Sequence, residues 1–246
     1  MKDFYQIILR LPQAKQAQLS PLAKVVDIGH LHVSTNSIVA CDPLYSYGAT
    51  EPFTQKVPNG DFPVRLYYTR EFGQRIAFAV LQFKDQPVHH WQMALRGDER
   101  SEDLAENEFY GYEVEAGMGC FKDEKASALY YDKILTLRQD NGPGFNHYKQ
   151  YIEPEMEKQK EFDYLNLRPS PEHPHNVIMF SSGIGDGLYP SYFGLDENDE
   201  VVCLLTDFLL FRRGDYIRAL SGMLNTDLKY LGSRWHSQPS DIQRYS

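Results

Sequence analysis

The most hydrophobic pattern in the sequence lies in residues 75–83. Ile76, Phe78 and Val80 fall on one face of an extended chain, and alanine, leucine and phenylalanine side chains fall on the other. A strand that is apolar on both faces is typical of a position covered on both sides. We therefore predict a central strand here. Residues 62–69, rich in β-branched and aromatic side chains, predict a second strand.

Turn-forming residues divide the other hydrophobic stretches into short strands. Residues 30–41 are predicted to form a hairpin, with the polar residues 34–37 as its turn. Residues 188–194 and 201–205 are predicted to pair through the polar turn 196–199. Strands joined by such short turns are antiparallel. Further strands are expected at residues 88–95, paired near the central strand, and at residues 112–114 and 176–181.

Three segments have the features of helices. Asp123 can cap a helix that runs through Ile134, because its carboxylate accepts the free N–H groups of a first turn. The acidic residues 98–108 predict a short solvated helix. Beyond Gly214, apolar residues recur at helical spacing and predict a C-terminal helix. These residues are Tyr216, Ala219, Leu220, Met223 and Leu224.

The elements together predict one α+β domain over residues 1–246, with a mainly antiparallel twisted sheet and a few flanking helices. Residues 25–208 form its expected core, and residues 209–246 form the C-terminal helix and tail. Residues 141–175 are rich in Pro, Glu, Lys and Gln and have little periodic hydrophobicity. We interpret this segment as a surface insertion.

Charge narrows the classes of function. The formal net charge is −9, and negative charge repels phosphate backbones and anionic lipids. No run approaches the roughly 18 apolar residues of a membrane helix, and the N-terminus lacks the pattern of a secretory signal. We therefore expect a cytoplasmic protein that binds neither nucleic acid nor a membrane, and a cationic protein as partner. The 17 tyrosines suit a binding surface, and tyrosines around an ordinary core are the alternative.

Four phrases of the sequence resemble, in order and spacing, a bacterial family known only as domain of unknown function 4241. They are DIGH (27–30) leading to ACDPL (40–44), GYEVEAG (111–117), GCFKD (119–123), and residues 180–208, which contain SSGIGDGLYPSY (181–192) and end in TDF. The resemblance covers most of residues 25–208. It departs at Glu115, where the family pattern has aspartate. Since the family has no established activity, the resemblance implies candidate positions and no mechanism.

The candidate site residues are carboxylates beside glycine, proline or a strand end, where loops from a sheet converge. They are Asp42, Asp123, Asp186 and Asp207, with Glu115 as a fifth. Clustered carboxylates bind hard cations or divide acid and base roles. Each also has a structural interpretation: Asp42 in a turn before proline, Asp123 as a helix cap, and Asp186 in an Asx-turn. The metal is left open, and no cofactor is expected.

The three cysteines, Cys41, Cys120 and Cys203, are odd in number and widely spaced, which favours reduced thiols over a disulfide framework. Cys120 lies just before a predicted helix start, where a thiol pKa can fall and a nucleophile can form. His173 or His175 would then be the base. A buried, inert cysteine is the favoured interpretation of Cys120.

Other patterns carry weak signals. The pairs His30 with His32 and His173 with His175 have a spacing that can ligate zinc, without a CxxC or HExxH motif. Residues 196–207 match some positions of a calcium loop, but Val201 replaces its glycine, so a hairpin turn is favoured. The glycine-rich residues 181–187 lack the lysine of a phosphate-binding loop.

Two hypotheses for the function follow. The first is an immunity-type interaction protein that neutralises a cationic toxin or effector through an acidic, tyrosine-rich face. The second is a metal-assisted hydrolase in which Asp42, Asp123, Asp186 and Asp207 bind a cation or activate water. Convergence of these acids in a pocket would favour the enzyme, and their separation into turns would favour the first hypothesis. Glu102, Asp103, Glu106 and Glu108 are candidate charges at the rim of such a binding face, and a plain solvated surface is the favoured interpretation of them.

Overall fold

The hydrophobic segment identified above forms strand β4 (Ile76–Gln82), and all of its residues are buried. The computed structural model describes residues 23–46, 50–69, 74–105 and 108–210. In it β4 is the third of six strands, with β3 (Gly60–Thr69) on one side and β12 (Val201–Asp207) on the other, both antiparallel. The predicted central strand is confirmed.

The six-stranded sheet has the order β1-β3-β4-β12-β11-β5. The predicted pairing of residues 188–194 with 201–205 is confirmed, because β11 and β12 form an antiparallel hairpin. The segment predicted to pair near the central strand lies instead at the sheet edge, where β5 pairs with β11. The other strands of this sheet are β1 (Ala23–Val33), β11 (Ser191–Leu195) and β5 (His90–Met93).

A second, four-stranded antiparallel sheet has the order β2-β7-β9-β8. Its inner face packs against the six-stranded sheet, because Ile38, Phe121 and Phe180 share one buried cluster with Leu66 and Leu204. Two short strands, β6 and β10, pair with each other. The strands are β2 (Ile38–Cys41), β7 (Met118–Asp123), β9 (Val177–Ser181), β8 (Tyr164–Leu167), β6 (Tyr112–Val114) and β10 (Gly187–Tyr189).

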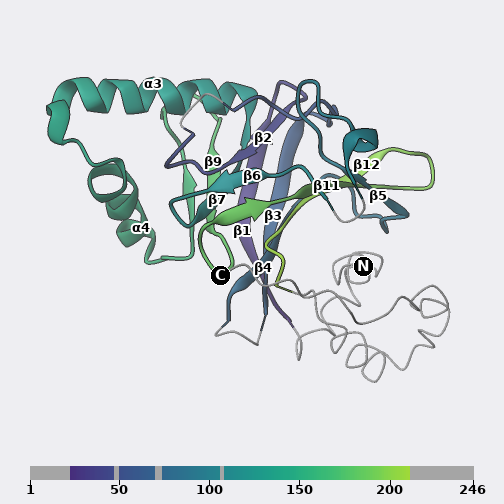
Figure 1. The fold of residues 1–246 in the computed structure, drawn as a ribbon. Helices are drawn as coiled ribbons and strands as arrows, with labels where there is room; N and C mark the ends of the chain where they lie inside the picture. The colour runs from purple at the N-terminus through teal and green to yellow at the C-terminus, as the bar shows by residue number, and fades with distance from the viewer. Residues whose placement is uncertain (1–22, 47–49, 70–73, 106–107, 211–246) are drawn as a thin grey trace. The chain divides into compact units, whose positions relative to one another are not determined.

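Helices cover the other face of the four-stranded sheet. Helix α3 (Glu124–Asn141) begins after its cap Asp123, as predicted, and extends beyond Ile134. Its buried residues form a second apolar cluster with strands β2, β7, β8 and β9 and with helix α4 (Glu153–Gln159). Figure 1 shows α3 and α4 on the same side of the strands. The α+β class, with mainly antiparallel sheets, is confirmed.

The predicted hairpin at residues 30–41 is wrong, although both of its strands exist. Strand β1 pairs with β3, and β2 pairs with β7, so the two arms belong to different sheets. The intervening turn is held by Asp123, which accepts hydrogen bonds from the backbone N–H groups of Ser34 and Thr35. A distant carboxylate therefore holds this turn, and the arms do not pair with each other.

The segment 141–175 is more regular than the predicted surface insertion. It contains a 3-10 turn (Gly142–Gly144), a π-helical turn (Tyr148–Ile152), α4 and β8. Its few apolar residues are buried at wide spacings, which hid them from a search for periodicity. They include Ile152, Met156, Leu165 and Leu167.

Of the two remaining predicted helices, one is much shorter than expected and the other lies outside the described residues. Of the acidic residues 98–108, only Ser101–Asp103 form a helix, a single 3-10 turn, and residues 106–107 are outside the described part. The predicted C-terminal helix after Gly214 also lies outside the described residues, which end at 210.

Candidate functional site

Asp42 is fully buried, and both of its carboxylate oxygens accept backbone hydrogen bonds. Oδ1 accepts from the N–H groups of Leu44 (2.8 Å) and Tyr45 (3.3 Å). Oδ2 accepts from the N–H groups of Glu115 (3.0 Å) and Ala116 (2.7 Å). Asp42 thus closes the turn after β2 and attaches it to the residues between β6 and β7. A buried carboxylate is tolerated when hydrogen bonds of this kind satisfy it.

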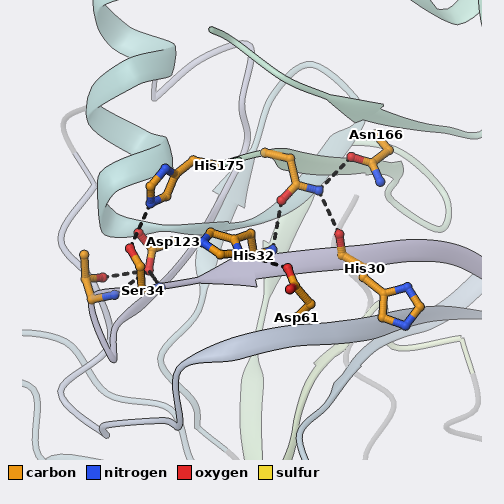
Figure 2. A network of polar contacts seen from close by, with 9 residues as sticks. His30, His32, Ser34, Asp61, Asp123, Asn166 and His175 are labelled. Atoms are coloured by element: carbon orange, nitrogen blue, oxygen red, sulfur yellow. Dashed lines mark hydrogen bonds and ion pairs between the residues drawn. The ribbon is translucent and has the colours of Figure 1, made fainter. Parts of the chain in front are cut away.

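Asp123 is also fully buried and joins two elements. Its Oδ1 accepts from the N–H of Lys125 (2.7 Å) and caps α3, as predicted from the sequence. Its Oδ2 accepts from the N–H groups of Ser34 and Thr35 (both 2.9 Å) and from the Thr35 hydroxyl (2.8 Å). Figure 2 shows Asp123 beside Ser34 of this turn. Asp123 therefore fixes the β1–β2 turn against the start of the helix.

Asp207 and Asp186 lie in two further turns. Asp207 is almost completely buried at the end of β12, and its Oδ1 accepts from the N–H of Leu209 (2.8 Å). Its own N–H donates to the carbonyl of Pro190 (3.0 Å). Asp186 is exposed, in the glycine-rich loop between β9 and β10.

The structure does not gather these aspartates around one cavity. In the β2–β7 register Ile38 lies opposite Asp123, whereas Cys41 lies opposite Cys120. Asp42 and Asp123 therefore lie at opposite ends of the strand pair, roughly 13 Å apart at about 3.3 Å per residue. Within the described residues, no group of three or more histidine, cysteine, aspartate or glutamate side chains is placed to hold a metal ion.

The phrases that contain these aspartates nevertheless meet at one place. Strand β6 belongs to the phrase 111–117, strand β10 belongs to the phrase 181–192, and Asp42 binds the residues that follow β6. We call residues 112–117 and 182–189 the acidic ribbon. Leu188 lies opposite Glu113 in its register, and Gly187 lies opposite Val114.

The acidic ribbon has one buried face and one exposed face. Tyr112, Val114 and Tyr189 point into the core. Directly opposite residues of an antiparallel pair project to the same face, so Glu113 and Leu188 share the other one. Glu113 and Leu188 are exposed on this face, Glu115 and Asp186 are exposed just beyond the ends of the paired strands, and Ile184 of the loop before β10 is 68% exposed.

Hydrogen bonds and close packing hold the loop of the ribbon in place. The hydroxyl groups of Ser182 and Tyr189 both donate to the carbonyl of Gly185, at 2.8 Å each. The N–H of Ser182 donates to the carbonyl of Gly117 (3.0 Å). Gly183 has φ +45°, and a Cβ there would lie 2.8 Å from the Cβ of Phe208. Glycine is therefore required at position 183 for both its conformation and its contact.

A network of polar side chains lies at the seam between the two sheets. Asn176 is buried: its Oδ1 accepts from the N–H of His32 (2.9 Å), and its Nδ2 donates to the His30 carbonyl (2.8 Å) and to Asn166 Oδ1 (2.7 Å). Asn176 thereby joins β1 to β8, and Figure 2 shows two of its partners, His30 and Asn166. His30 and His32 line a hollow of about 520 Å³, together with Asp61, Asn166, Arg168, Pro174 and Asn176.

Two of the four histidines predicted as weak zinc candidates, His32 and His175, form side-chain hydrogen bonds. His32 Nδ1 lies 2.8 Å from Asp61 Oδ1, and His175 Nε2 lies 2.8 Å from the Ser34 hydroxyl. The rings of His32 and His175 meet edge to face at 5.1 Å. Burial lowers the pKa of His175, and the carboxylate of Asp123 opposes this shift. A neutral His175 suits its contact with a hydroxyl group.

The hypothesis of a Cys120 nucleophile with a histidine base does not match the geometry. Cys120 is fully buried beside Cys41, and burial raises the pKa of its thiol. His175 instead contacts Ser34, in the turn held by Asp123. The calcium-loop interpretation fails similarly, because Asp196 Oδ1 accepts from the N–H groups of Asn198 and Glu200 within the β11–β12 turn.

Fold and site define an α+β protein of two packed antiparallel sheets, with buried aspartates that tie its turns and an exposed acidic ribbon. The chain belongs to the family described as "Protein of unknown function (DUF4241)", which matches residues 31–206. The match includes the acidic ribbon, Asp42 and Asp123. No curated protein and no solved structure matches the chain. In the part of the chain described here, no helix has the length and apolar character needed to cross a membrane.

Proposed function

We propose that this chain is a bacterial, cytoplasmic interaction protein of the immunity type, which binds a cationic toxin or effector protein and neutralises it. The acidic ribbon is the proposed binding surface. The observation that carries the proposal is the exposure, along this one ribbon, of the carboxylates of Glu113, Glu115 and Asp186 and of the apolar side chains of Leu188 and Ile184.

Charge on the ribbon supports a cationic partner. None of its three exposed carboxylates takes part in an ion pair with another described residue. The chain as a whole carries a formal charge of −9. Complementary charge speeds the encounter of two proteins, and apolar anchors that lose water on binding slow their separation. Ile184 and Leu188 supply such anchors between the charges.

Positions of the other conspicuous acids support an architectural role. A metal-assisted hydrolase needs carboxylate oxygens directed at a metal ion or a water molecule. The oxygens of Asp42 and Asp123 accept hydrogen bonds from backbone N–H groups, both of their own turns and of segments distant in the sequence. Asp186, the one exposed aspartate among the four predicted, lies on the ribbon. Its exposure fits a surface charge.

The proposal is tested by co-expression with a cationic toxin encoded beside this gene. We expect the chain to restore growth of cells that produce the toxin, and the two proteins to purify as a stable complex. Reversal of ribbon charge, by Glu113→Lys with Asp186→Lys, should abolish both effects. Continued toxicity with the unaltered chain, or the lack of any such neighbouring gene across genomes, would contradict the proposal.

A further inference from the structure

Two of the three cysteines face each other across neighbouring strands. Cys41 of β2 lies directly opposite Cys120 of β7 in the antiparallel register, and their Sγ atoms are 3.7 Å apart. Directly opposite residues in such a pair have Cβ atoms about 4.5–5.5 Å apart. A disulfide needs Cβ atoms about 3.5–4.5 Å apart and Cα atoms about 4.4–6.8 Å apart. A small movement of the two strands therefore brings both sulfur atoms into bonding distance.

A buried cation accompanies the two thiols. Lys122 is two residues from Cys120 along β7, so both side chains project to the same face of the sheet. Its side chain is fully buried, and its Nζ lies 5.6 Å from the centre of the Tyr130 ring. A hydrogen bond from Cys120 and the positive charge of Lys122 lower the pKa of Cys41, against the opposing effect of burial. Burial raises the pKa of Cys120.

We propose that Cys41 and Cys120 form a redox-active dithiol, which a peroxide oxidises to an intramolecular disulfide. The Cys41 thiolate attacks an oxygen of hydrogen peroxide, the O–O bond breaks, and the hydroxide released takes up a proton to become water. The sulfur of Cys120 then attacks the Cys41 sulfenic acid. The S–S bond forms as the S–O bond breaks, and the departing hydroxide leaves as water with the proton of Cys120. Two thiols and one peroxide thus give one disulfide and two waters.

The position of β2 provides a route to the buried thiols. It has four residues and lies at the edge of the four-stranded sheet, where β7 is its only partner among the described strands and its outer side is held by hydrogen bonds from Phe53 and Arg96. Short edge elements open locally at a smaller free-energy cost than the centre of a sheet. Cys203 is a matched internal control: it is equally buried, but on β12 inside the other sheet, and burial raises its pKa to about 12.

The test is thiol counting on the folded, full-length chain treated with hydrogen peroxide. After an acid quench, the protein is unfolded, its free thiols are alkylated, and its mass and peptides are measured. We expect alkylatable thiols to fall from three to one, with the peptides of Cys41 and Cys120 joined and Cys203 alkylated. Dithiothreitol should restore all three. The oxidation rate should rise with pH, because the thiolate form of Cys41 attacks the peroxide.

Serine variants distinguish formation of this disulfide from unspecific oxidation of the thiols. In Cys203→Ser, peroxide should still join Cys41 to Cys120, so both of its thiols should be lost, as these two are in the unaltered chain. Cys41→Ser should keep Cys120 and Cys203 alkylatable, with circular dichroism to show that it is folded. Retention of all three thiols in the unaltered chain would overturn the proposal. So would their loss as oxygen adducts without a joined peptide, or loss of Cys203 at the same rate as Cys41 and Cys120.

Discussion

At the scale of single residues, the buried carboxylates of Asp42 and Asp123 are held by backbone N–H donors from segments distant in the sequence. Asp42 reaches Ala116, 74 residues away, and Asp123 reaches Ser34, 89 residues away. Leaving a buried donor without its acceptor costs about 1–3 kcal/mol per group. Both aspartates therefore stabilise the fold through the turns that they close.

The substitution Asp42→Asn tests this role, because it replaces one carboxylate oxygen with an amide nitrogen and leaves the size of the side chain nearly unchanged. The amide presents one N–H₂ group toward backbone N–H groups that Asp42 now satisfies, so we expect a loss of about 3 kcal/mol in the free energy of unfolding. Urea unfolding measures it. Asp186→Asn, on the exposed ribbon, is the control and should change stability by less than about 0.5 kcal/mol. An unchanged free energy of unfolding in Asp42→Asn would contradict the role of this carboxylate in stabilising the fold.

His147 gives the protein a pH dependence with a definite sign. Its Nε2 lies 2.7 Å from the Tyr130 hydroxyl, and burial, helped by the charge of Arg138, lowers its pKa from 6.5 to about 4. Between these values the unfolded chain binds a proton that the folded chain does not. The contribution of His147 to the free energy of unfolding is therefore fully present above about pH 6.5. It is lost as the pH falls toward 4, and the loss reaches about 3 kcal/mol.

The measurement is urea unfolding of the unaltered chain and of His147→Gln at neutral pH and near pH 4. We expect the difference in unfolding free energy between the two proteins to shrink as the pH falls, because glutamine does not titrate. Carboxylates that protonate in the same range contribute equally to both proteins. A difference that is constant across this range would contradict the lowered pKa of His147.

At the scale of elements, the acidic ribbon depends on close contact between its two strands. A Cβ on Gly111, at the start of β6, would lie 2.6 Å from the backbone carbonyl oxygen of Tyr189 in β10. No backbone atom can yield at that distance without displacing the strand. A residue without a Cβ is therefore needed at this junction for the two strands of the ribbon to pair.

Gly111→Ala should lower the melting temperature and move β10 away from β6. Gly144→Ala is a matched control, because nothing lies within 4 Å of its Cβ position, and it should be neutral or slightly stabilising. Thermal unfolding compares the two variants, and amide hydrogen exchange locates the change. Loss of protection at Tyr112 and Val114 in Gly111→Ala is the expected pattern. Equal melting temperatures for both variants would contradict the close contact.

Local patterns in the sequence predict most strands and the start of α3, because alternation and capping depend on neighbouring residues. Which strands pair with each other is harder to predict. The hairpin predicted at residues 30–41 fails because its turn binds Asp123, and nothing near residue 34 encodes a carboxylate so far along the chain. The same holds for the site: the contacts of Asn176 with His30 and of Cys41 with Cys120 join residues 146 and 79 positions apart.

At the scale of the described fold, two sheets share one core, and polar residues hold the seam between them. Asn176 and Asp123 connect turns and strands of both sheets, so the surface loops start from fixed positions. The acidic ribbon is thereby presented as a rigid, negatively charged face. A preorganised surface loses little conformational freedom on binding, and its affinity for a cationic partner should fall as salt screens the charges.

The most direct measurement is a binding titration with the proposed partner, a cationic toxin or effector protein sought among the genes beside this one. Three forms of the chain are compared: the unaltered protein, the ribbon variant Glu113→Lys with Asp186→Lys, and a variant of equal net charge on helix α3, Asp132→Lys with Asp140→Lys. All four positions are exposed. We expect the ribbon variant to bind at least about tenfold more weakly, equivalent to about 1.4 kcal/mol, and the helix variant to bind within about twofold of the unaltered protein. Equal loss of affinity in both variants, or no loss in either, would contradict the ribbon as the binding surface.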